Sequence, residues 1–340
     1  YSDIDDIEAE IYTRESLIQK TKQAFKVSIS EKYTYGVDFD DLLYIAVKKN
    51  LNIGKFDFIF VDEAQDTAPI QREILRKIMK SDSRLVAVGD PYQSIYGFRG
   101  ADSESMNLIK DEFNCVSLPL HISYRCPKNV VVAAQNYCSI IQCADTAIEG
   151  NVQNLKKDWS IRMFKDGDFI LSRTNAPLIS LCYKLIINKI PAKILGREIG
   201  ENLINLIERL SKNDDLELYI FDERLDSWYK KELKRIDKAS ASQKSSIEDR
   251  YICIKALVKS MNQLDKVGNL INTLRNMFNN SNATIILSSI HKAKGLEAER
   301  VFWLNKDKII KTNQEWETLQ ERNMKYVAVT RSKKDLFYIE

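Results

Sequence analysis

A short apolar run that ends in two adjacent carboxylates constrains this chain more than any other stretch. Phe58–Val61 combines aromatic and β-branched residues, a composition typical of a strand buried on both faces of a parallel sheet. Asp62 and Glu63 follow directly. In open α/β sheets, ligands bind at the carboxyl ends of the strands. We therefore expect a site at this strand end, although the pair alone would favour a simpler interpretation, an acidic strand end that caps the next helix.

The two carboxylates suit different tasks. Asp62 is the candidate Mg²⁺ ligand, because Mg²⁺ prefers oxygen ligands and keeps several of its waters. Glu63, one residue further on, can orient or deprotonate an attacking water. Only together with the residues that accompany it along the chain does the pair indicate metal-assisted hydrolysis.

The stretch belongs to a predicted strand–helix–strand unit, which requires a parallel sheet and so the α/β class. Pro69 suits the first turn of the helix, and Leu85–Val88 reads as the second strand. Upstream, residues 1–35 are charged with helical periodicity, and Asp38 suits the N-cap of another helix. The apolar face of the helix after Pro69 carries Ile70, Ile74, Leu75 and Ile78.

The loop after the second strand carries a further set of candidate residues. Gln93 could bond a phosphate oxygen or the attacking water. Tyr96, Phe98 and Arg99 combine flat aromatic faces with one cation, as base stacking on single-stranded nucleic acid requires. The alternative is that the aromatic rings pack into the core.

The second half of the chain repeats the strand–helix alternation, except over residues 197–282. That region is rich in Lys, Asp and Asn and reads as helical, and Lys238–Ser246 reads as a flexible linker. We expect a first domain over residues 1–113, a second over 114–196 and 283–340, and a helical insertion over 197–282. The strands expected in the second domain are Cys115–Leu118, Asp168–Leu171, Ala192–Leu195, Thr284–Leu287, Val301–Leu304 and Leu336–Ile339.

Composition narrows the function classes. With 51 basic and 48 acidic residues among 340, the net charge is +3, so any basic surface must be local. The six cysteines contain no CxxC spacing and there are two histidines, which argues against a zinc site. No apolar run reaches the ~18 residues of a membrane span, and no signal peptide is visible. We therefore expect a cytoplasmic protein without a membrane partner.

Five segments together resemble motifs II to VI of the UvrD-like superfamily 1 DNA helicases. They are VDEAQD, GDPYQSIYGFRGAD, SYRCP, IHKAKGLE and YVAVTR, in the order of that family, and SRTNAP and IHKAKGLEAERVFWLN are similar to the short, phage-type members. The resemblance implies two RecA-like, P-loop NTPase-type domains with parallel sheets. It also implies ATP with Mg²⁺ in the cleft between them and single-stranded DNA across their top.

The resemblance assigns roles in ATP hydrolysis. It makes Asp62 the Mg²⁺ ligand, Glu63 the general base and Gln93 the sensor of the γ-phosphate. Arg125 and Arg331 match the two arginines that reach the γ-phosphate from the second domain, where they act like arginine fingers.

It also assigns contacts to the nucleotide base, the ribose and DNA. Tyr124 matches the aromatic residue that stacks on adenine, and Glu297 matches a ribose contact beside Gly295. Phe98 stands where relatives commonly have Trp. The residues implied in DNA contact are Tyr96, Phe98, Arg99, His291, Arg173 and Asn175.

One motif of the family does not appear. A phosphate-binding loop has the pattern G-x-x-x-x-G-K-[ST], and none of the 11 glycines fits it. Gly54 precedes a lysine, but Phe56 stands where the pattern requires Ser or Thr. The first glycine of the pattern is also missing at the required spacing before Gly54. We expect a fragment of a longer chain that hydrolyses ATP poorly as it stands.

Two functions remain open at this point. The first is an ATP-dependent translocase or helicase that moves three-prime to five-prime on single-stranded DNA or on DNA with a single-stranded tail. The second is a non-hydrolysing DNA-binding or regulatory subunit derived from such a helicase. Intact Glu63, Gln93, Arg125 and Arg331 favour the first. The expected settings and partner proteins are those of DNA replication, repair or defence.

Overall fold

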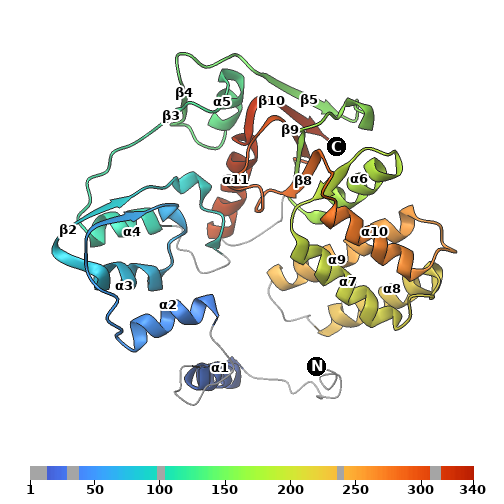
Figure 1. Ribbon diagram of the computed structural model, residues 1–340, viewed down its shortest axis with the longest axis horizontal. Helices are drawn as coiled ribbons and strands as arrows, with labels where there is room; N and C mark the ends of the chain where they lie inside the picture. Colours follow the sequence, from blue (N-terminus) through green and yellow to red (C-terminus); the bar gives the residue numbers. More distant parts are fainter. Residues whose placement is uncertain (1–13, 29–37, 98–103, 236–240, 307–314) are drawn as a thin grey trace. The chain divides into compact units, whose positions relative to one another are not determined.

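The computed structural model describes residues 14–28, 38–97, 104–235, 241–306 and 315–340. The chain divides into two compact units, each described here by itself (Figure 1). Unit 1 comprises Tyr1–Gly89 and Gly100–Val116, and unit 2 comprises Asp90–Arg99 and Ser117–Glu340. The predicted α/β class with parallel sheets, as in RecA-like domains, is confirmed. Among the described helices, none is both long and apolar enough to cross a membrane.

Unit 1 contains a parallel pair of strands, β1 and β2, joined through a helix. Asp38 forms the predicted N-cap, accepting a hydrogen bond from the Asp41 amide, and Pro69 opens α3. The strand β2 begins earlier than predicted, directly after α3. The elements are α1 (Arg14–Ser28), α2 (Phe39–Lys48), β1 (Phe56–Val61), η1 (Ala64–Asp66), α3 (Pro69–Ile78), β2 (Met79–Ala87) and α4 (Ser105–Glu112).

The prediction that β1 is buried on both faces is wrong. Phe58 and Phe60 are 59% and 75% exposed, whereas Ile59 is 7% exposed. Side chains alternate between the two faces of a strand, so one face is covered and the other is open. Val61 lies on the face of Ile59 and lines a pocket with residues of α2 and α3. No described element of unit 1 covers the face of the two phenylalanines, which explains the difference.

Unit 2 is built on a six-stranded parallel sheet with the strand order β5-β10-β9-β6-β8-β7. The strand β5, which the sequence did not indicate, pairs with β10 at one edge of the sheet. The strands are β3 (Ile122–Ser123), β4 (Gln142–Cys143), β5 (Asn151–Lys156), β6 (Phe169–Ser172), β7 (Ala192–Ile194), β8 (Ile285–Ser289), β9 (Ala298–Leu304) and β10 (Ser332–Ile339). The helices are α5 (Lys128–Gln135), α6 (Asn175–Ile187), α7 (Arg197–Ser211), α8 (Leu218–Arg235), α9 (Ala241–Ser260), α10 (Val267–Asn279) and α11 (Glu315–Val329), and short 3-10 turns include η2 (Pro91–Gln93).

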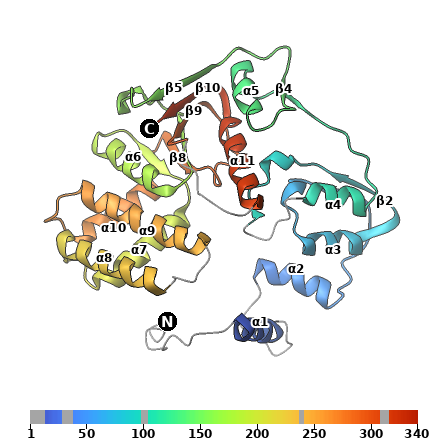
Figure 2. The same ribbon diagram turned by 180° about the vertical axis from the view of Figure 1, so that it is seen from behind.

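Helices cover both faces of this sheet. Along β6, Phe169 and Leu171 belong to one buried cluster with residues of α5 and α11. Ile170, between them, belongs to the other cluster, with residues of α6, α7, α9 and α10. Alternating side chains of one strand therefore enter two separate cores, as expected for a central strand of a parallel sheet. Figures 1 and 2 both show α7–α10 gathered into one helical cluster, and α6 packs against α9 and α10.

Two further local predictions are wrong. Cys115–Leu118 is not a strand, and Val116 and Leu118 are 83% and 82% exposed. An extended segment becomes a strand only where a neighbouring strand pairs with it, and no described strand does. In the predicted linker Lys238–Ser246, the part from Ala241 onward belongs to α9, while residues 238–240 lie outside the described residues.

A buried carboxyl group lies beside an arginine at the start of β6. Asp168, 1% exposed, accepts a hydrogen bond from the Lys165 amide at 2.8 Å, and Arg300 Nη1 lies 3.4 Å from Asp168 Oδ1. The guanidinium of Arg300 also lies 5.2 Å from the ring centre of Phe302 and 5.5 Å from that of Phe337. Burial raises the pKa of Asp168 above its ordinary value.

We expect the Asp168→Asn variant to change the pH dependence of stability. The folded state holds the Asp168 proton more tightly than the unfolded state does. The stability contributed by this carboxyl is therefore complete below the ordinary pKa of 3.8 and is lost as pH rises through the folded pKa. Denaturant unfolding at a series of pH values should show the parent losing stability relative to the variant across that window. Asp158→Asn, at an exposed carboxyl, is the control, and identical curves for parent and Asp168→Asn would contradict the assignment.

Candidate functional site

The two carboxylates of unit 1 occupy a tight turn at the end of β1. Asp62 Oδ1 accepts a hydrogen bond from the Glu63 amide at 2.8 Å. Glu63 has a φ of 50°, in the left-handed region that side chains rarely adopt. Gln65 Nε2 donates to Glu63 Oε2 at 2.5 Å. Such backbone strain persists only where the surroundings enforce it, and it is a common feature of functional sites.

The end of β2 and the start of α4 hold this turn in place. The Ala64 amide donates to the Val88 carbonyl at 2.9 Å, and Ser105 Oγ donates to the Ala64 carbonyl at 3.0 Å. Gly89 follows Val88, and a Cβ there would lie 2.4 Å from Gln65 Oε1. A side chain at Gly89 would therefore displace Gln65, which itself holds Glu63.

The turn borders a pocket of about 340 Å³. The described residues contain no group of three or more His, Cys, Asp or Glu side chains that could hold a metal ion alone. Mg²⁺ commonly binds through one or two carboxylates together with substrate phosphates. The donor set therefore fits a Mg²⁺ ion that is bound together with a nucleotide. The pocket is lined by Leu43, Val61, Asp62, Glu63, Asp66, Thr67, Gln71, Ile74 and Leu75.

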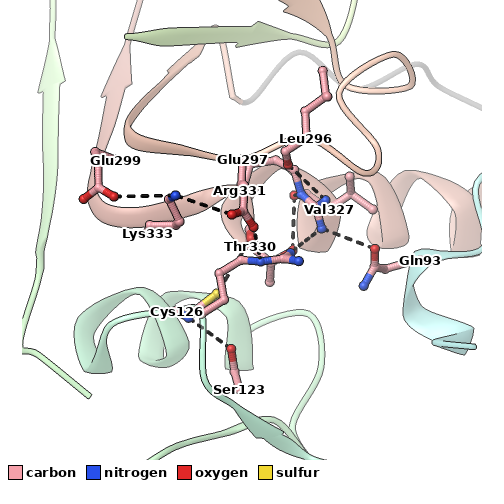
Figure 3. A network of polar contacts seen from close by, with 11 residues as sticks. Gln93, Ser123, Cys126, Leu296, Glu297, Glu299, Val327, Thr330, Arg331 and Lys333 are labelled. Carbon is pink, nitrogen blue, oxygen red and sulfur yellow. Dashed lines mark hydrogen bonds and ion pairs between the residues drawn. The ribbon is translucent and has the colours of Figure 1, made fainter. Parts of the chain in front are cut away.

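In unit 2, Arg331 lies at the end of α11 and is 1% exposed (Figure 3). Its Nε donates to the Val327 carbonyl at 3.0 Å, and Nη1 donates to the Leu296 carbonyl at 3.2 Å. Its Nη2 lies 3.2 Å from both Gln93 Oε1 and Thr330 Oγ1. These bonds hold the guanidinium in one orientation.

A second arginine lies in an exposed network beside the first. Arg125 Nε lies 2.7 Å from Glu297 Oε2, and the other oxygen of Glu297 lies 3.4 Å from Lys333 Nζ. Lys333 also approaches Glu299 (Figure 3). Burial, together with the charge of Arg125, lowers the pKa of Arg331. The positive charges of Arg125 and Arg331 therefore interact, and the carboxylate of Glu297 partly balances them.

The two other predicted nucleotide residues border this network. Tyr124 follows the short strand β3, directly before Arg125, and is 84% exposed, so its ring can receive a flat base. Gly295 has a φ of 81° and precedes Leu296. The carbonyl of Leu296 accepts a hydrogen bond from Arg331. The structure therefore brings together Tyr124, Arg125 and the loop of Gly295.

Gln93 connects Arg331 to the loop before β9. Its Oε1 accepts from Arg331, and its Nε2 donates to Asp90 Oδ2 at 2.9 Å. Its backbone carbonyl accepts from Lys294 Nζ at 3.0 Å. One residue therefore contacts a predicted phosphate-binding arginine through its side chain and the loop of His291 through its backbone.

The predicted DNA residues Tyr96 and His291 lie together. The Tyr96 hydroxyl donates to the His291 carbonyl at 3.0 Å, and the two ring centres are 6.4 Å apart. Lys294 Nζ lies 5.2 Å from the centre of the Tyr96 ring, within cation–π range. Tyr96 is half-buried, so the core alternative holds in part. Phe98 and Arg99 lie outside the described residues, and their DNA role stays a prediction.

The loop that carries Gln93 and Tyr96 packs against the core of unit 2. Ile95, between them, is fully buried in the core cluster of α5 and α11. Asn323 on α11 donates to the Pro91 carbonyl at 3.2 Å and to the Ser94 carbonyl at 2.9 Å. The buried apolar anchor is Ile95, which leaves the ring of Tyr96 at the edge of the core.

The remaining predicted DNA residues engage acidic side chains of the chain itself. Arg173 binds Glu321 through Nε at 3.0 Å and Nη2 at 2.7 Å. Asn175 Nδ2 donates to Asp249 Oδ2 at 2.9 Å. The DNA role of Arg173 and Asn175 stays a prediction, and it would require these groups to exchange partners.

Sequence reasoning did not single out three residues that position this site. Lys294 and Asn323 hold the loop of Gln93, and Lys333 holds Glu297. All three stand inside or within three residues of the motif segments, and this closeness was the available signal. Their partners lie in distant parts of the chain, so the sequence offered no means of pairing them.

Comparison with known proteins finds helicase domains at both ends of the chain. Residues 5–114 match the model of the UvrD/REP helicase N-terminal domain, and residues 284–339 match that of the UvrD-like helicase C-terminal domain. The F-box DNA helicase protein 1 of Schizosaccharomyces pombe is 27% identical over 354 residues, which cover 95% of this chain and 39% of that protein.

Two bacterial proteins are more similar over shorter stretches. The ATP-dependent DNA helicase PcrA of Leuconostoc citreum is 33% identical over 129 residues, 33% of this chain and 17% of the relative. The ATP-dependent DNA helicase Rep of Buchnera aphidicola is 33% identical over 130 residues, 36% of this chain and 18% of the relative. The chain thus spans 17 to 39% of the length of these relatives. The chain thus matches a UvrD/REP helicase N-terminal domain and a UvrD-like helicase C-terminal domain in order, and its relatives are superfamily 1 helicases of the PcrA and Rep type.

Proposed function

We propose that this chain forms the hydrolytic and DNA-contacting part of an ATP-dependent single-stranded DNA translocase or helicase. The observation that carries the proposal is the position of Gln93. It contacts Arg331 with its side chain and Lys294 with its backbone, three residues before Tyr96 in the same loop. A phosphate that moved against Arg331 would therefore shift Gln93, and through Gln93 the loop of Tyr96, which is expected to contact DNA.

In the proposed reaction each unit contributes one kind of group. Asp62 of unit 1 would hold Mg²⁺, which neutralises phosphate charge, and Glu63 would orient the attacking water and accept its proton. Arg125 and Arg331 of unit 2 would stabilise the charge that develops on the transferred phosphoryl group. Tyr124 would stack on adenine, and Glu297 would contact the ribose after releasing Arg125.

The finer parts of the proposal rest on family resemblance. They are movement in the three-prime to five-prime direction, a substrate of single-stranded DNA or tailed duplex, and partner proteins in replication, repair or defence. A non-hydrolysing DNA-binding subunit is the second candidate, favoured by the absence of the phosphate-binding pattern from these 340 residues. ATP turnover by a protein that joins this chain to a phosphate-binding loop would exclude the second candidate.

The DNA part of the proposal can be tested on the chain itself. We expect Tyr96→Ala to weaken binding of a labelled single-stranded oligonucleotide by about 1–3 kcal/mol, because a base loses its stacking partner. Tyr96→Phe keeps the ring and removes only the hydroxyl that donates to the His291 carbonyl, so it should bind nearly as the parent does. Fluorescence anisotropy measures both. Unchanged affinity of Tyr96→Ala with a large fall in melting temperature would instead assign the ring to the core.

A further inference from the structure

The carboxyl ends of β6 and β8 leave the six-stranded sheet side by side. Ser172 pairs with Ser289 in the last register position of the two strands, and the Ile290 amide donates to the Ser172 carbonyl at 3.0 Å. Arg173 follows β6 directly, and Lys292 lies in the loop after β8. Ligands of open α/β sheets bind at this edge. Two cationic residues therefore stand where the fold presents groups to a ligand.

Carboxylates of the chain itself occupy both cations. Arg173 forms a two-pronged ion pair with Glu321 of α11, in which Nη2 lies 2.7 Å and Nε 3.0 Å from Oε1. Lys292 pairs with Glu198, which stands in the first turn of α7. The hydrogen bond from Lys292 lowers the pKa of Glu198 below its ordinary value, so this carboxylate is charged at neutral pH. Two helices that are distant in the sequence thus place negative charge against one edge of the sheet.

The same edge holds buried polar atoms that the folded chain does not satisfy. Asn175, at the start of α6, donates to Asp249 of α9, but its own Oδ1 is buried without a hydrogen-bond partner among the described residues. The Ser172 hydroxyl, directly before Arg173, is fully buried and also lacks a partner in the described part of the chain. Unsatisfied buried polar groups are unfavourable and call for an explanation. Stability alone therefore does not explain the arrangement of this edge.

Carboxylate and phosphate oxygens are interchangeable partners for these two cations. A planar guanidinium forms the same two-pronged bonds with either anion, and an ammonium group binds either one as a point charge. The side chains of Lys292 and Glu198 are 43% and 55% exposed, and an exposed ion pair contributes little to stability. Those of Arg173 and Glu321 are 18% and 13% exposed. Lys292 can therefore change partners easily, and Arg173 more slowly.

We propose that Glu321 and Glu198 occupy the positions of backbone phosphates of single-stranded DNA, and that a bound strand replaces them at Arg173 and Lys292. The inference rests on the proposed DNA-binding function and deepens it. It makes Lys292 a phosphate contact, and through Glu198 it gives the helices α7–α10 a part in setting DNA affinity. Each exchange of a carboxylate for a phosphate costs an existing ion pair, so both carboxylates weaken DNA binding.

The test measures binding of a labelled oligothymidylate to the full chain by fluorescence anisotropy. Glu321→Gln keeps the shape of the side chain but removes the charge that competes for Arg173. It should bind about fivefold tighter or more, since an exposed ion pair is worth up to about fivefold and this pair is less exposed. Glu315→Gln removes the same charge from an exposed position of α11. This control should bind within about twofold of the parent, because salt screens distant exposed charges.

A second substitution shows whether Arg173 is the group that gains the phosphate. Addition of Arg173→Met to Glu321→Gln should cancel the gain in affinity. It should also reduce the slope of log affinity against log salt by about 0.7, the value of one phosphate contact on a single strand. A gain that survives Arg173→Met would overturn the inference, because the charge of Glu321 would then act at a distance and not through its pair.

The exposed pair repeats the test where the fold is not at risk. Glu198→Gln should melt near the parent and bind about two- to fivefold tighter, and addition of Lys292→Gln should cancel the gain. If Glu321→Gln does not fold, this pair decides the outcome. Binding no tighter than that of Glu315→Gln by every folded variant would overturn the inference. A chain that binds no oligonucleotide in any of these forms would instead contradict the proposed function, so the two failures are distinguishable.

Discussion

Replacement of Arg125 by alanine is expected to lower the ATP turnover number by about 10³-fold or more, the scale for an arginine that acts mainly in the transition state. The side chain of Arg125 is 43% exposed, and its guanidinium pairs with Glu297. An exposed ion pair contributes about 0–1 kcal/mol to stability. The melting temperature should therefore stay near that of the parent. Steady-state ATPase assays on a protein that joins this chain to a phosphate-binding loop measure the turnover.

Arg331→Ala provides the comparison, because the same rate loss should come with a different effect on stability. Arg331 is fully buried, and its guanidinium donates to carbonyls of Val327 and Leu296. Removal of the guanidinium leaves the buried Val327 carbonyl without this donor, which costs about 1–3 kcal/mol, so the melting temperature should fall. If either variant lost nucleotide affinity but kept the parent turnover at saturating ATP, its arginine would bind only the ground state.

The second large effect is expected at Glu63. Glu63→Gln should retain binding of ATP and DNA but lose turnover by about 10²-fold or more, because an amide still hydrogen-bonds water but cannot accept its proton. The substitution is nearly isosteric, so the strained turn and its contact with Gln65 should be maintained. The same steady-state assay, with single-stranded DNA present, measures the loss.

A matched substitution controls for the removal of one negative charge. Glu73 on α3 is exposed and pairs with Arg76 of the same helix. Glu73→Gln should therefore keep the parent turnover. A Glu63→Gln variant that turned over ATP within a few-fold of the parent would remove Glu63 from the role of general base.

Features governed by neighbouring residues could be predicted from the sequence. Asp38 caps α2 and Pro69 opens α3, because both effects act within one helical turn. Asp62 and Glu63 follow a strand end as expected, because a run of strand-forming residues followed by charged residues marks where the strand stops. The five motif segments indicated the family for the same reason, because each motif is a short local pattern that can be recognised in the sequence.

Pairings across the chain could not be predicted. Gln93 and Arg331 are 238 residues apart and share a hydrogen bond, and Arg173 meets Glu321 across 148 residues. Period-2 alternation placed Phe58 and Phe60 on one face of a strand, but only the surrounding elements decide whether that face is covered.

The sequence by itself therefore determined the α/β class, the helix ends and the residue types of the site. The tertiary structure decided which groups share the site. It placed Gln93 against Arg331 and Tyr96 against His291. The physical reason is that caps, strand ends and motifs depend on interactions within a few residues. Contacts between distant segments depend on how the sheet and α11 bring those segments together.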